Sequence, residues 1–501
     1  MKSNSKCRIL ILPSNESIYK EKGTLLLDAL ASGNHSVSAD CGGRGTCGKC
    51  RVKLLSGSVA GASVDSNGYV LACRATIIED ITVFYGDSLH GGLEDMKASF
   101  TSLDKKSGLG IALDIGTTTV AACLVDLESG EITKKTSSLN PQRSFGADVL
   151  SRIQASNEGK LFMLRDAIVA EAKRIIDLLS DGKPVDELVI SANTTMLHLF
   201  LGVDPASIGV SPFVAAFLDS RELSGCDIGL PVSRVTLLPS ASAYIGSDVV
   251  SGIVSTGLVQ DKRINMLIDI GTNGEIVISV GGKLYAASTA AGPALEGASI
   301  ECGVGGISGA IKKVSVNYGE LDISTIDDAL PVGICGSGLI DAMAILVSHG
   351  LVDECGNFDY DCDSPLSARL VDDKFYLTDK IYISKADIRQ IQLAKSALRS
   401  GINTLFVMSG INADRVDSYY IAGGLGYYMS VESAITVGLL PPECKGRVEI
   451  SGNTSLSGAI EAMLSSRKLD KAKSVAKMIE IIDLAGSSYF QNEFINNIYF
   501  N

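Results

Sequence analysis

The chain has 501 residues, of which 46% are hydrophobic and 20% charged, so it is long enough for roughly two to four globular domains and is not a disordered chain. Its formal net charge of -13 argues against a general binder of nucleic acid or of anionic membranes.

No segment of the sequence predicts an export signal or a membrane span. Lys2 and Lys6 precede only a short apolar run at 7–12, which predicts a first strand. The apolar stretch at 332–352 is interrupted by Asp341 and by glycines. The 12 cysteines are too sparse for a disulfide-bonded secreted scaffold. We therefore expect a cytoplasmic protein whose cysteines are reduced unless they hold a metal.

The first ninety residues predict a small sheet with one helix. The expected strands cover 7–13, 16–22, 50–57 and 81–85, and a short leucine-rich helix covers 24–33.

Four cysteines gather in this region with the spacing C-x5-C-x2-C-x22-C; they are Cys41, Cys47, Cys50 and Cys73. Four thiolates that converge from a glycine-rich loop and a later segment suit a [2Fe–2S] cluster, because glycines let backbone N–H groups approach the sulfurs. A structural zinc ion is one alternative, although zinc prefers two close cysteine pairs and only Cys47 and Cys50 form such a pair. Ordinary buried cysteines are the other alternative.

Residues 5–88 resemble the β-grasp ferredoxins with a [2Fe–2S] cluster, and the spacing of the first two cysteines is similar to that of the adrenodoxin branch. The resemblance implies that the four cysteines named above are the cluster ligands. The other eight cysteines are expected to be small buried side chains; they are Cys7, Cys123, Cys226, Cys302, Cys335, Cys355, Cys362 and Cys444.

Residues 89–107 carry glycines, serines and charges without a clear period, which predicts a linker. A flexible linker of this length would let the preceding cluster domain swing toward a target.

An internal repeat follows the linker. The segments 110–126 and 266–282 share an apolar strand, the sequence Asp-Ile-Gly-Thr, a polar turn and a second apolar strand. Each predicts a β-hairpin whose turn presents backbone N–H donors to phosphate oxygens, while the acid holds Mg²⁺ through water. One such turn alone is as compatible with an ordinary hairpin, but two facing turns would clamp a triphosphate. The candidate residues are Asp114 and Asp269 for the metal ion and Gly116, Thr117, Thr118, Gly271, Thr272 and Asn273 for the phosphates.

Three further segments accompany the repeat. We expect a helix of small residues at 239–253 and a second small-residue helix at 430–441. Between them, the segment 420–428 predicts a strand that runs into the paired glycines Gly423 and Gly424. The paired glycines would let a flat adenine lie against bare backbone.

This order of phosphate turn, connector, phosphate turn, adenosine site and connector resembles the actin-like ATPase superfamily over residues 108–501. The resemblance implies the fold class, which is an α+β β-grasp ferredoxin domain followed by an α/β, duplicated, two-lobed, ribonuclease H-like ATPase domain. The expected divisions are a cluster domain at 1–88, a linker at 89–107, lobe I at 108–253 and lobe II at 254–501.

Six more stretches narrow the resemblance; they are 140–153, 191–202, 288–303, 333–343, 387–402 and 450–463. Together with the cluster domain they resemble the reductive activators of corrinoid proteins. The resemblance implies ATP-dependent transfer of an electron from the [2Fe–2S] cluster to inactive cob(II)alamin on a partner corrinoid protein, which regenerates cob(I)alamin. It places that partner in a methyltransferase or O-demethylase system, requires an external electron donor and is compatible with a homodimer.

Other residues have candidate roles beside simpler interpretations. Glu275 and Glu296 are candidates for positioning the attacking water, with solvated carboxylates as the alternative. Ser288, followed by Thr289, is a candidate for reaching the corrinoid, with an ordinary strand end as the alternative. His198 is predicted to be a histidine of the core.

Two other function classes stay open at this point. One is an Hsp70-like nucleotide-gated binding module whose ferredoxin domain is only an electron carrier. The other is a small-molecule kinase, which would need a carboxylate base in the cleft.

Overall fold

The structure is a computed structural model of the chain. It describes residues 6–12, 16–32, 35, 37, 39, 43–45, 50–64, 68–84, 93, 96, 99–101, 104–259, 262–426 and 428–500. Among the helices of these residues, none is both long enough and apolar enough to cross a membrane.

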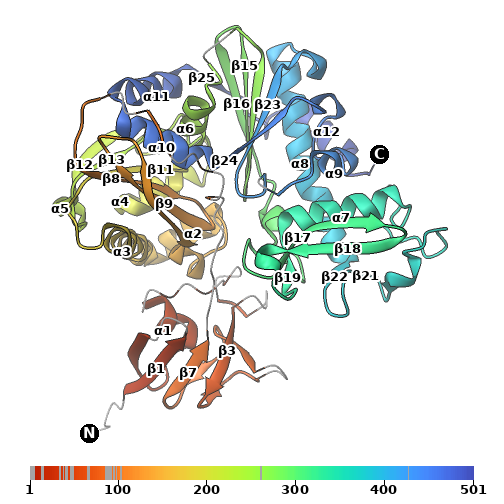
Figure 1. The fold of residues 1–501 in the computed structure, drawn as a ribbon, viewed down its shortest axis with the longest axis horizontal. Coiled ribbons are helices and arrows are strands. Elements are labelled where there is room, and N and C mark those ends of the chain that lie inside the picture. Colours follow the sequence, from red (N-terminus) through yellow and green to blue (C-terminus); the bar gives the residue numbers. More distant parts are fainter. Residues whose placement is uncertain are drawn as a thin grey trace.

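The first part of the chain is a five-stranded sheet with one helix against it (Figure 1). The strand order is β2-β1-β7-β3-β5, and β1 pairs antiparallel with β2 and parallel with β7. The bounds are β1 Lys6–Leu12, β2 Glu16–Glu21, α1 Leu26–Ser32, β3 Arg51–Ser56, β5 Tyr69–Leu71 and β7 Ile81–Phe84, with a small ladder of β4 Val59–Ala60 and β6 Thr76–Ile77. Ile9 and Ile11 alternate with outward residues along β1 and pack with Leu26 and Leu30 of the helix. The small sheet with one helix is therefore confirmed.

A second sheet begins with the first repeat segment. Its order is β10-β9-β8-β11-β13-β12, in which β8, β9 and β10 form an antiparallel meander and β8, β11 and β13 are parallel. The strands are β8 Leu109–Ile115, β9 Thr119–Asp126, β10 Ile132–Leu139, β11 Val185–Ala192, β12 Arg221–Ser224 and β13 Val232–Leu237. The helices are α2 Val149–Ala155, α3 Leu161–Ser180, α4 Thr194–Leu201 and α5 Gly225–Ile228, with short turns η1 Pro141–Ser144, η2 Ser156–Lys160 and η3 Ala206–Ile208.

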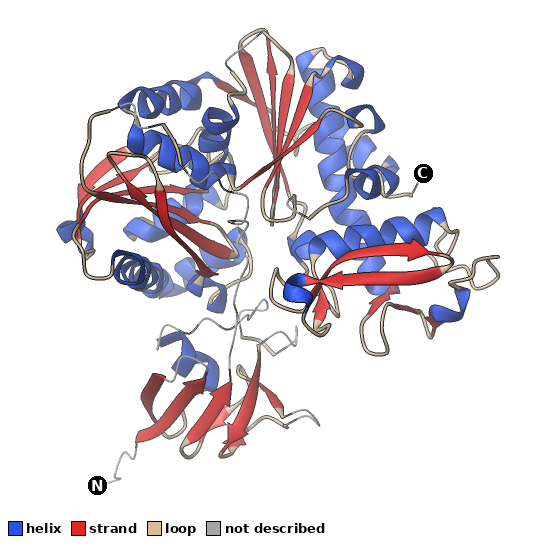
Figure 2. Ribbon diagram, viewed as in Figure 1, coloured by secondary structure: helices blue, strands red, loops and turns tan. Residues whose placement is uncertain are grey.

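A third sheet repeats this arrangement from the second repeat segment. Its order is β24-β23-β14-β15-β16-β25, again with an antiparallel meander from β14 to β16 and with β14, β23 and β24 parallel. The strands are β14 Asn265–Ile270, β15 Gly274–Val280, β16 Lys283–Thr289, β23 Ser418–Ala422, β24 Val448–Gly452 and β25 Ile479–Ile481. Helices cover both large sheets (Figure 2). The duplicated α/β architecture that the repeat predicted is confirmed.

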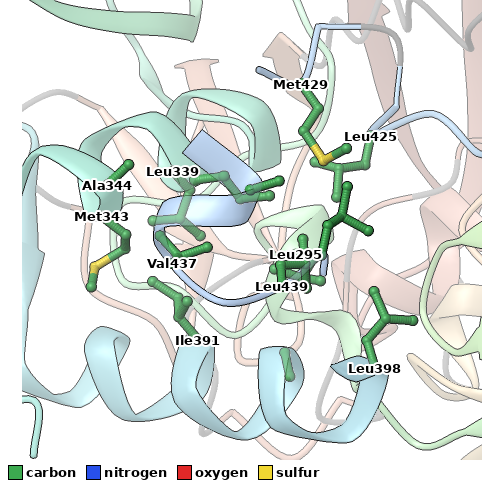
Figure 3. Close-up of a cluster of buried hydrophobic side chains, with 14 of the residues drawn as sticks. Leu295, Leu339, Met343, Ala344, Ile391, Leu398, Leu425, Met429, Val437 and Leu439 are labelled. Atoms are coloured by element: carbon green, nitrogen blue, oxygen red, sulfur yellow. The ribbon is translucent and has the colours of Figure 1, made fainter. Parts of the chain in front are cut away.

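The long segment between β16 and β23 adds two small sheets and an apolar core. The strands are β17 Ala310–Asn317, β18 Glu320–Thr325, β19 Gly333–Ile334, β20 Leu370–Val371, β21 Lys374–Tyr376 and β22 Tyr382–Ser384. The helices are α7 Gly336–Ser348, α8 Lys385–Ser409 and, further along the chain, α9 Val431–Thr436 and α12 Ser488–Asn496; the short turns are η4 Pro293–Glu296, η5 Ile326–Asp328, η6 Ser367–Arg369, η7 Ala413–Arg415 and η8 Pro442–Cys444. Leu339 and Met343 of α7 meet Ile391 of α8 and Val437, which follows α9, in one buried cluster (Figure 3).

Two helices cross between the large sheets. They are α6 Ser247–Thr256, which packs on the third sheet, and α10 Thr454–Leu464, which packs on β8 and β11 of the second, and they lie against each other (Figure 1). Small residues permit this approach, since a Cβ on Gly458 would lie 2.4 Å from the carbonyl oxygen of Ser251. Next along the chain, α11 Ser466–Met478 packs against α6 and α10.

Two expectations about these connectors are corrected. The helix expected at 239–253 begins only at Ser247. The helix expected as the second connector at 430–441 is α9, and it packs against α7, whereas α10 is the partner of α6. Both segments are rich in small residues, so that signal alone did not identify the crossing helix.

The expected linker is packed on the second sheet at its described positions. Leu93 and Phe100 are buried in a cluster with residues of β9 and α10. Lys135 of β10 donates to the Leu93 carbonyl over 3.1 Å, and the Phe100 N–H donates to the Gly130 carbonyl over 2.8 Å. At these residues the expected linker is therefore packed against the second sheet and α10.

Candidate active site

Two of the four predicted cluster cysteines are among the described residues, and they lie at one edge of the first sheet. Cys50 precedes β3 and Cys73 follows β5, and these strands pair, so the two side chains meet. Both are buried, their sulfur atoms are 3.2 Å apart, and the Cys73 N–H points at the Cys50 sulfur over 3.5 Å. Close buried thiols with an N–H directed at sulfur fit an iron–sulfur cluster. Cys41 and Cys47 lie outside the described residues.

The glycine-rich loop has a backbone that needs its glycines. Gly43 and Gly45 have φ of +81° and +76°, the left-handed region. The Arg74 guanidinium donates to the Gly45 carbonyl over 2.9 Å, and a Cβ on Gly45 would lie 2.4 Å from Arg74 Nε. Arg74 follows Cys73 directly, so Gly45 is held near this cysteine.

Among the other cysteines, the expectation of burial holds only in part. Cys7, Cys123, Cys335 and Cys444 are buried, whereas Cys226 and Cys355 are exposed and Cys302 and Cys362 are half-buried.

The two repeat turns meet each other across the large sheets. In each, the glycine closes the turn: the Gly116 N–H donates to the Thr119 carbonyl over 2.9 Å, and the Gly271 N–H to the Asn273 carbonyl over 3.0 Å. Both predicted hairpins are thus confirmed.

Glu296 joins the two turns. The hydroxyls of Thr118 and Thr272 are 3.5 Å apart, and both donate to Glu296 Oε2, over 2.9 Å and 2.7 Å respectively. Glu296 ends η4, which follows β16. Its carboxylate therefore accepts from one hydroxyl of each repeat.

Four half-buried carboxylates lie near one another beside these turns. Asp114 and Asp269 are the penultimate residues of β8 and β14, Glu275 is paired with Asp269 across the hairpin, and Asp248 lies in the first turn of α6. Burial and then neighbouring carboxylates raise the pKa of Asp248 and of Asp269 to about 7. The same causes raise the pKa of Glu275 well above its usual range.

The carboxylates of this group are ligands of the kind that a hydrated Mg²⁺ ion uses. In the part of the chain that the structure describes, no three His, Cys, Asp or Glu side chains stand close enough to bind one metal ion together. Mg²⁺ commonly keeps several waters and uses one or two carboxylates. Like charges that raise each other's pKa are relieved by such a cation.

Asp114 is held by the start of α10. Asn453 Nδ2 donates to Asp114 Oδ2 over 2.8 Å, and Ser455 Oγ donates to Oδ1 over 2.7 Å. Burial raises the pKa of Asp114, and these two hydrogen bonds oppose the shift. Asn453 is also the N-cap of α10, since its Oδ1 accepts from the Leu456 N–H over 2.7 Å.

The first turn is supported from behind by polar side chains of lobe I. Asn140 Nδ2 donates to the Gly116 carbonyl over 2.7 Å, and Asn193 Nδ2 donates to Thr117 Oγ1 over 3.2 Å. The fully buried Arg152 donates to the Thr117 carbonyl and to the Gly146 carbonyl. Burial lowers the pKa of Arg152 to about 9. A buried guanidinium thus lies directly behind the turn.

The segment expected to bind the adenosine begins where β23 ends. Gly423 has φ of +91°, and a Cβ there would lie 2.4 Å from the Ile270 carbonyl oxygen, so this glycine packs on the second hairpin. A Cβ on Gly424 would meet open space.

Two further predicted residues have clear surroundings. Ser288 Oγ donates to Glu275 Oε1 over 3.2 Å, which directs it to the acidic group of the cleft. His198 is buried, its Nδ1 lies 2.7 Å from the Thr194 carbonyl oxygen, and its ring stacks on Phe217. The prediction of a core histidine is confirmed.

Sequence reasoning missed several residues of the cleft; they are Asp248, Asn453, Ser455, Arg152, Asn140 and Asn193. The available signals are the helix-cap residues Asn193 and Asn453, which precede α4 and α10.

Matching acidic turns at corresponding places in two related sheets define the class of ASKHA-type nucleotide-binding proteins, here preceded by a ferredoxin-type domain. Family models agree over nearly the whole chain. The 2Fe-2S iron-sulfur cluster binding domain matches residues 9–77, the RACo middle region matches 109–261, and the C-terminal domain of RACo, the ASKHA domain, matches 263–501.

Individual relatives define the family of the chain more closely. It is 35% identical over 419 residues to the corrinoid activation enzyme RamQ of Eubacterium limosum, covering 78% of this chain and 70% of that protein. It is 27% identical over 430 residues to the [Co(II) methylated amine-specific corrinoid protein] reductase of Methanosarcina barkeri, covering 77% and 76%. A solved reductive activator for corrinoid, iron-sulfur protein superposes with a TM-score of 0.73 at 28% identity, covering 99% and 98%. The chain belongs to this family of corrinoid-protein activators.

Proposed function

We propose that the chain is an ATP-dependent reductive activator of a partner corrinoid protein. When bound, the [2Fe–2S] cluster supplies one electron that reduces cob(II)alamin on the partner to cob(I)alamin. The observation that carries the proposal is the presence, in one chain of this family, of the buried thiol pair Cys50 and Cys73 and of two repeat turns that meet beside a shared acidic group. Cys41 and Cys47 would complete the ligand set.

We infer that the chain divides into a cluster domain at 1–88, a linker at 89–107 and two lobes at 108–253 and 254–501. The sheet pair then binds ATP between its two turns. An external electron donor must reduce the cluster domain after each transfer, and a homodimer is compatible with this arrangement.

Within the cleft we assign a role to each residue type. Asp114 and Asp269 hold Mg²⁺ through water, because their carboxylates lie at the ends of the first strands of both hairpins. Backbone N–H groups and side chains of the turns bind the phosphates; these residues are Gly116, Thr117, Thr118, Gly271, Thr272 and Asn273. Gly423 and Gly424 lie under the adenosine.

Glu296 and Glu275 are the candidates for positioning the attacking water. Glu296 faces both turns through Thr118 and Thr272. Ser288 orients Glu275 by its hydrogen bond. Its raised pKa makes Glu275 a stronger base, when ionised, than an ordinary glutamate.

ATP contributes by differential binding. Each 59 mV by which a one-electron transfer is uphill costs about 1.4 kcal/mol. A nucleotide supplies such free energy only if it binds one conformation of the protein better than another. Closure of the two lobes around the nucleotide would provide two such conformations, open and closed.

The test uses the reduced, cluster-loaded full chain and a cob(II)alamin-bearing corrinoid protein from a methyltransferase system. The cobalt spectrum is followed with and without Mg·ATP. We expect Co(II) to disappear only with Mg·ATP, and we expect Cys73→Ser to abolish the reaction while nucleotide binding remains. Cys226→Ser, at an exposed cysteine, is the matched control.

Two outcomes contradict the proposal and identify the alternatives. Equal reduction without ATP indicates a simple electron carrier attached to a nucleotide-gated module. Phosphorylation of a free small molecule, with no change in cobalt, indicates a kinase.

A further inference from the structure

We propose that α10 couples the nucleotide site to the segment that carries the cluster domain. Lys106 is the residue whose hydrogen bonds change when the helix moves. This inference rests on the proposed function, which supplies the nucleotide and the cluster. It adds a route between them that consists of described contacts at both ends of one helix.

The first end of α10 contacts the nucleotide site through Asp114. Both oxygens of this carboxylate accept from α10 and its cap, at 2.7 Å from Ser455 and 2.8 Å from Asn453. Ser455 Oγ also lies 2.9 Å from Ser191 Oγ on β11. A cation or phosphate that draws on Asp114 therefore changes the hydrogen bonds that fix the N-terminus of α10.

The body of α10 is suited to transmit a shift along its axis. It has 11 residues and hence a length of about 16 Å. Its buried side chains pack on the second sheet, whereas Gly458 lies against α6. Packed helices move as rigid units, because close-packed interfaces are not continuously deformable.

The second end of α10 contacts the linker. Lys106 Nζ donates to the Met463 carbonyl over 2.6 Å, and the Asp104 N–H donates to the Leu464 carbonyl over 3.2 Å. Just beyond the helix, the Ser466 N–H donates to Asp104 Oδ2 over 2.7 Å. Two hydrogen bonds thus join the end of the linker to the last two residues of α10, and Asp104 also accepts from Ser466, the first residue of α11.

Apolar contacts extend this attachment back along the linker. Leu93 and Phe100 are buried in the same cluster as Met463 and Leu464. Gly130 is needed there, since a Cβ would lie 2.0 Å from the Phe100 carbonyl oxygen. Leu93 and Phe100 are therefore seated on α10 and on the hairpin beside it.

Lys106 bridges α10 and the sheet on which α10 lies. Besides Met463 it binds both carboxylate oxygens of Glu187 on β11, each at 3.2 Å. If α10 slides along the sheet, the Met463 carbonyl moves relative to Lys106, whereas the Glu187 carboxylate on the sheet does not. The ammonium group must then redistribute its hydrogen bonds, which alters how the linker is held.

The experiment compares Lys106→Met with Lys105→Met, which changes the adjacent exposed lysine. Loss of Lys106 leaves Glu187 paired with Arg234, so the buried carboxylate keeps a cationic partner. Hydrogen exchange of the Phe100 and Asp104 amides is measured in the full chain with and without Mg²⁺ and a non-hydrolysable ATP analogue. Nucleotide affinity is measured in parallel.

We expect nucleotide to change exchange at these amides by about fivefold or more in the wild-type chain and in Lys105→Met. In Lys106→Met the change should fall below about twofold while nucleotide affinity stays within about threefold. Lys106→Arg, which keeps a cationic donor, should restore part of the change.

Three results overturn the coupling. The first is a full nucleotide response in Lys106→Met. The second is nucleotide binding to the wild-type chain without any response of the linker, which refutes the coupling and leaves the proposed function standing. If the wild-type chain binds no nucleotide, the proposed function itself fails and the coupling fails with it.

Discussion

Replacing Asp248 with Asn tests whether the cleft holds mutually repelling, desolvated carboxylates. Asp248 lies in the first turn of α6, and its Oδ1 accepts from the Val249 N–H over 2.8 Å. The side-chain oxygen of Asn can keep this hydrogen bond. The substitution therefore removes the charge with little change in shape.

The expected gain in stability follows from the pKa. An ordinary pKa of 3.8 in the unfolded chain rises to about 7 in the folded one. The folded state then binds more protons between these values, so stability falls as pH rises through this window and the whole penalty is present above about pH 7. The penalty is about 2 kcal/mol near pH 5 and at most about 4 kcal/mol near pH 8.

The assay is unfolding of the chelator-treated protein near pH 5 and near pH 8. We expect the stability of Asp248→Asn relative to wild type to increase by about 2–3 kcal/mol between the two values. Asp227→Asn is the control, because Asp227 is also an acid in a first helical turn, that of α5, but is exposed. Mg·ATP should stabilise the wild type more than Asp248→Asn near pH 8.

A relative stability of Asp248→Asn that is the same at both pH values would refute the reasoning. It would mean that Asp248 is as well solvated in the folded chain as in the unfolded one. A gain of the same size in Asp227→Asn would assign the effect to helix electrostatics instead.

Two other predictions concern the turns and the adenosine end. Glu296→Gln should lower ATP turnover by about 100-fold or more while ATP affinity stays within a few-fold, and unchanged turnover would remove Glu296 as the water-positioning group. Gly423→Ala should destabilise the chain by about 1–3 kcal/mol or more, because φ is +91° and the Cβ would meet the Ile270 carbonyl. Gly424→Ala should leave the melting temperature unchanged and weaken ATP and ADP alike; equal melting temperatures of the two alanine variants would contradict the packing assigned to Gly423.

The features that the sequence predicted well are those with a local signal. Each repeat turn is a contiguous run in which an acid, a glycine and hydroxyls follow an apolar strand, so Asp114 and Asp269 could be placed at matching positions before any fold was known. The cysteine spacing is likewise local, and strand pairing brings Cys50 and Cys73 together.

The features that were missed depend on contacts between distant segments. Asn453 and Ser455 look like an ordinary helix start, and only the fold places them on Asp114, more than 300 residues earlier in the chain. Asp248 likewise looks like an acid at a helix start. Neither local propensity nor periodicity carries information about which helix crosses to the other sheet, so the small residues of 430–441 predict a connector as well as those of α10 do.

The contacts of Glu296 suggest how ATP could act on both lobes at once. The hydroxyls of Thr118 and Thr272 donate to its carboxylate in this structure, and each hydroxyl has a single proton to donate. If the turns bind phosphate oxygens as proposed, those hydroxyls must leave Glu296, which frees this carboxylate to act on a water. Phosphate binding then replaces a contact within the protein by one through the ligand, in both repeats together. Only a ligand with such differential contacts can shift the balance between two conformations, which is what uphill electron transfer requires of ATP.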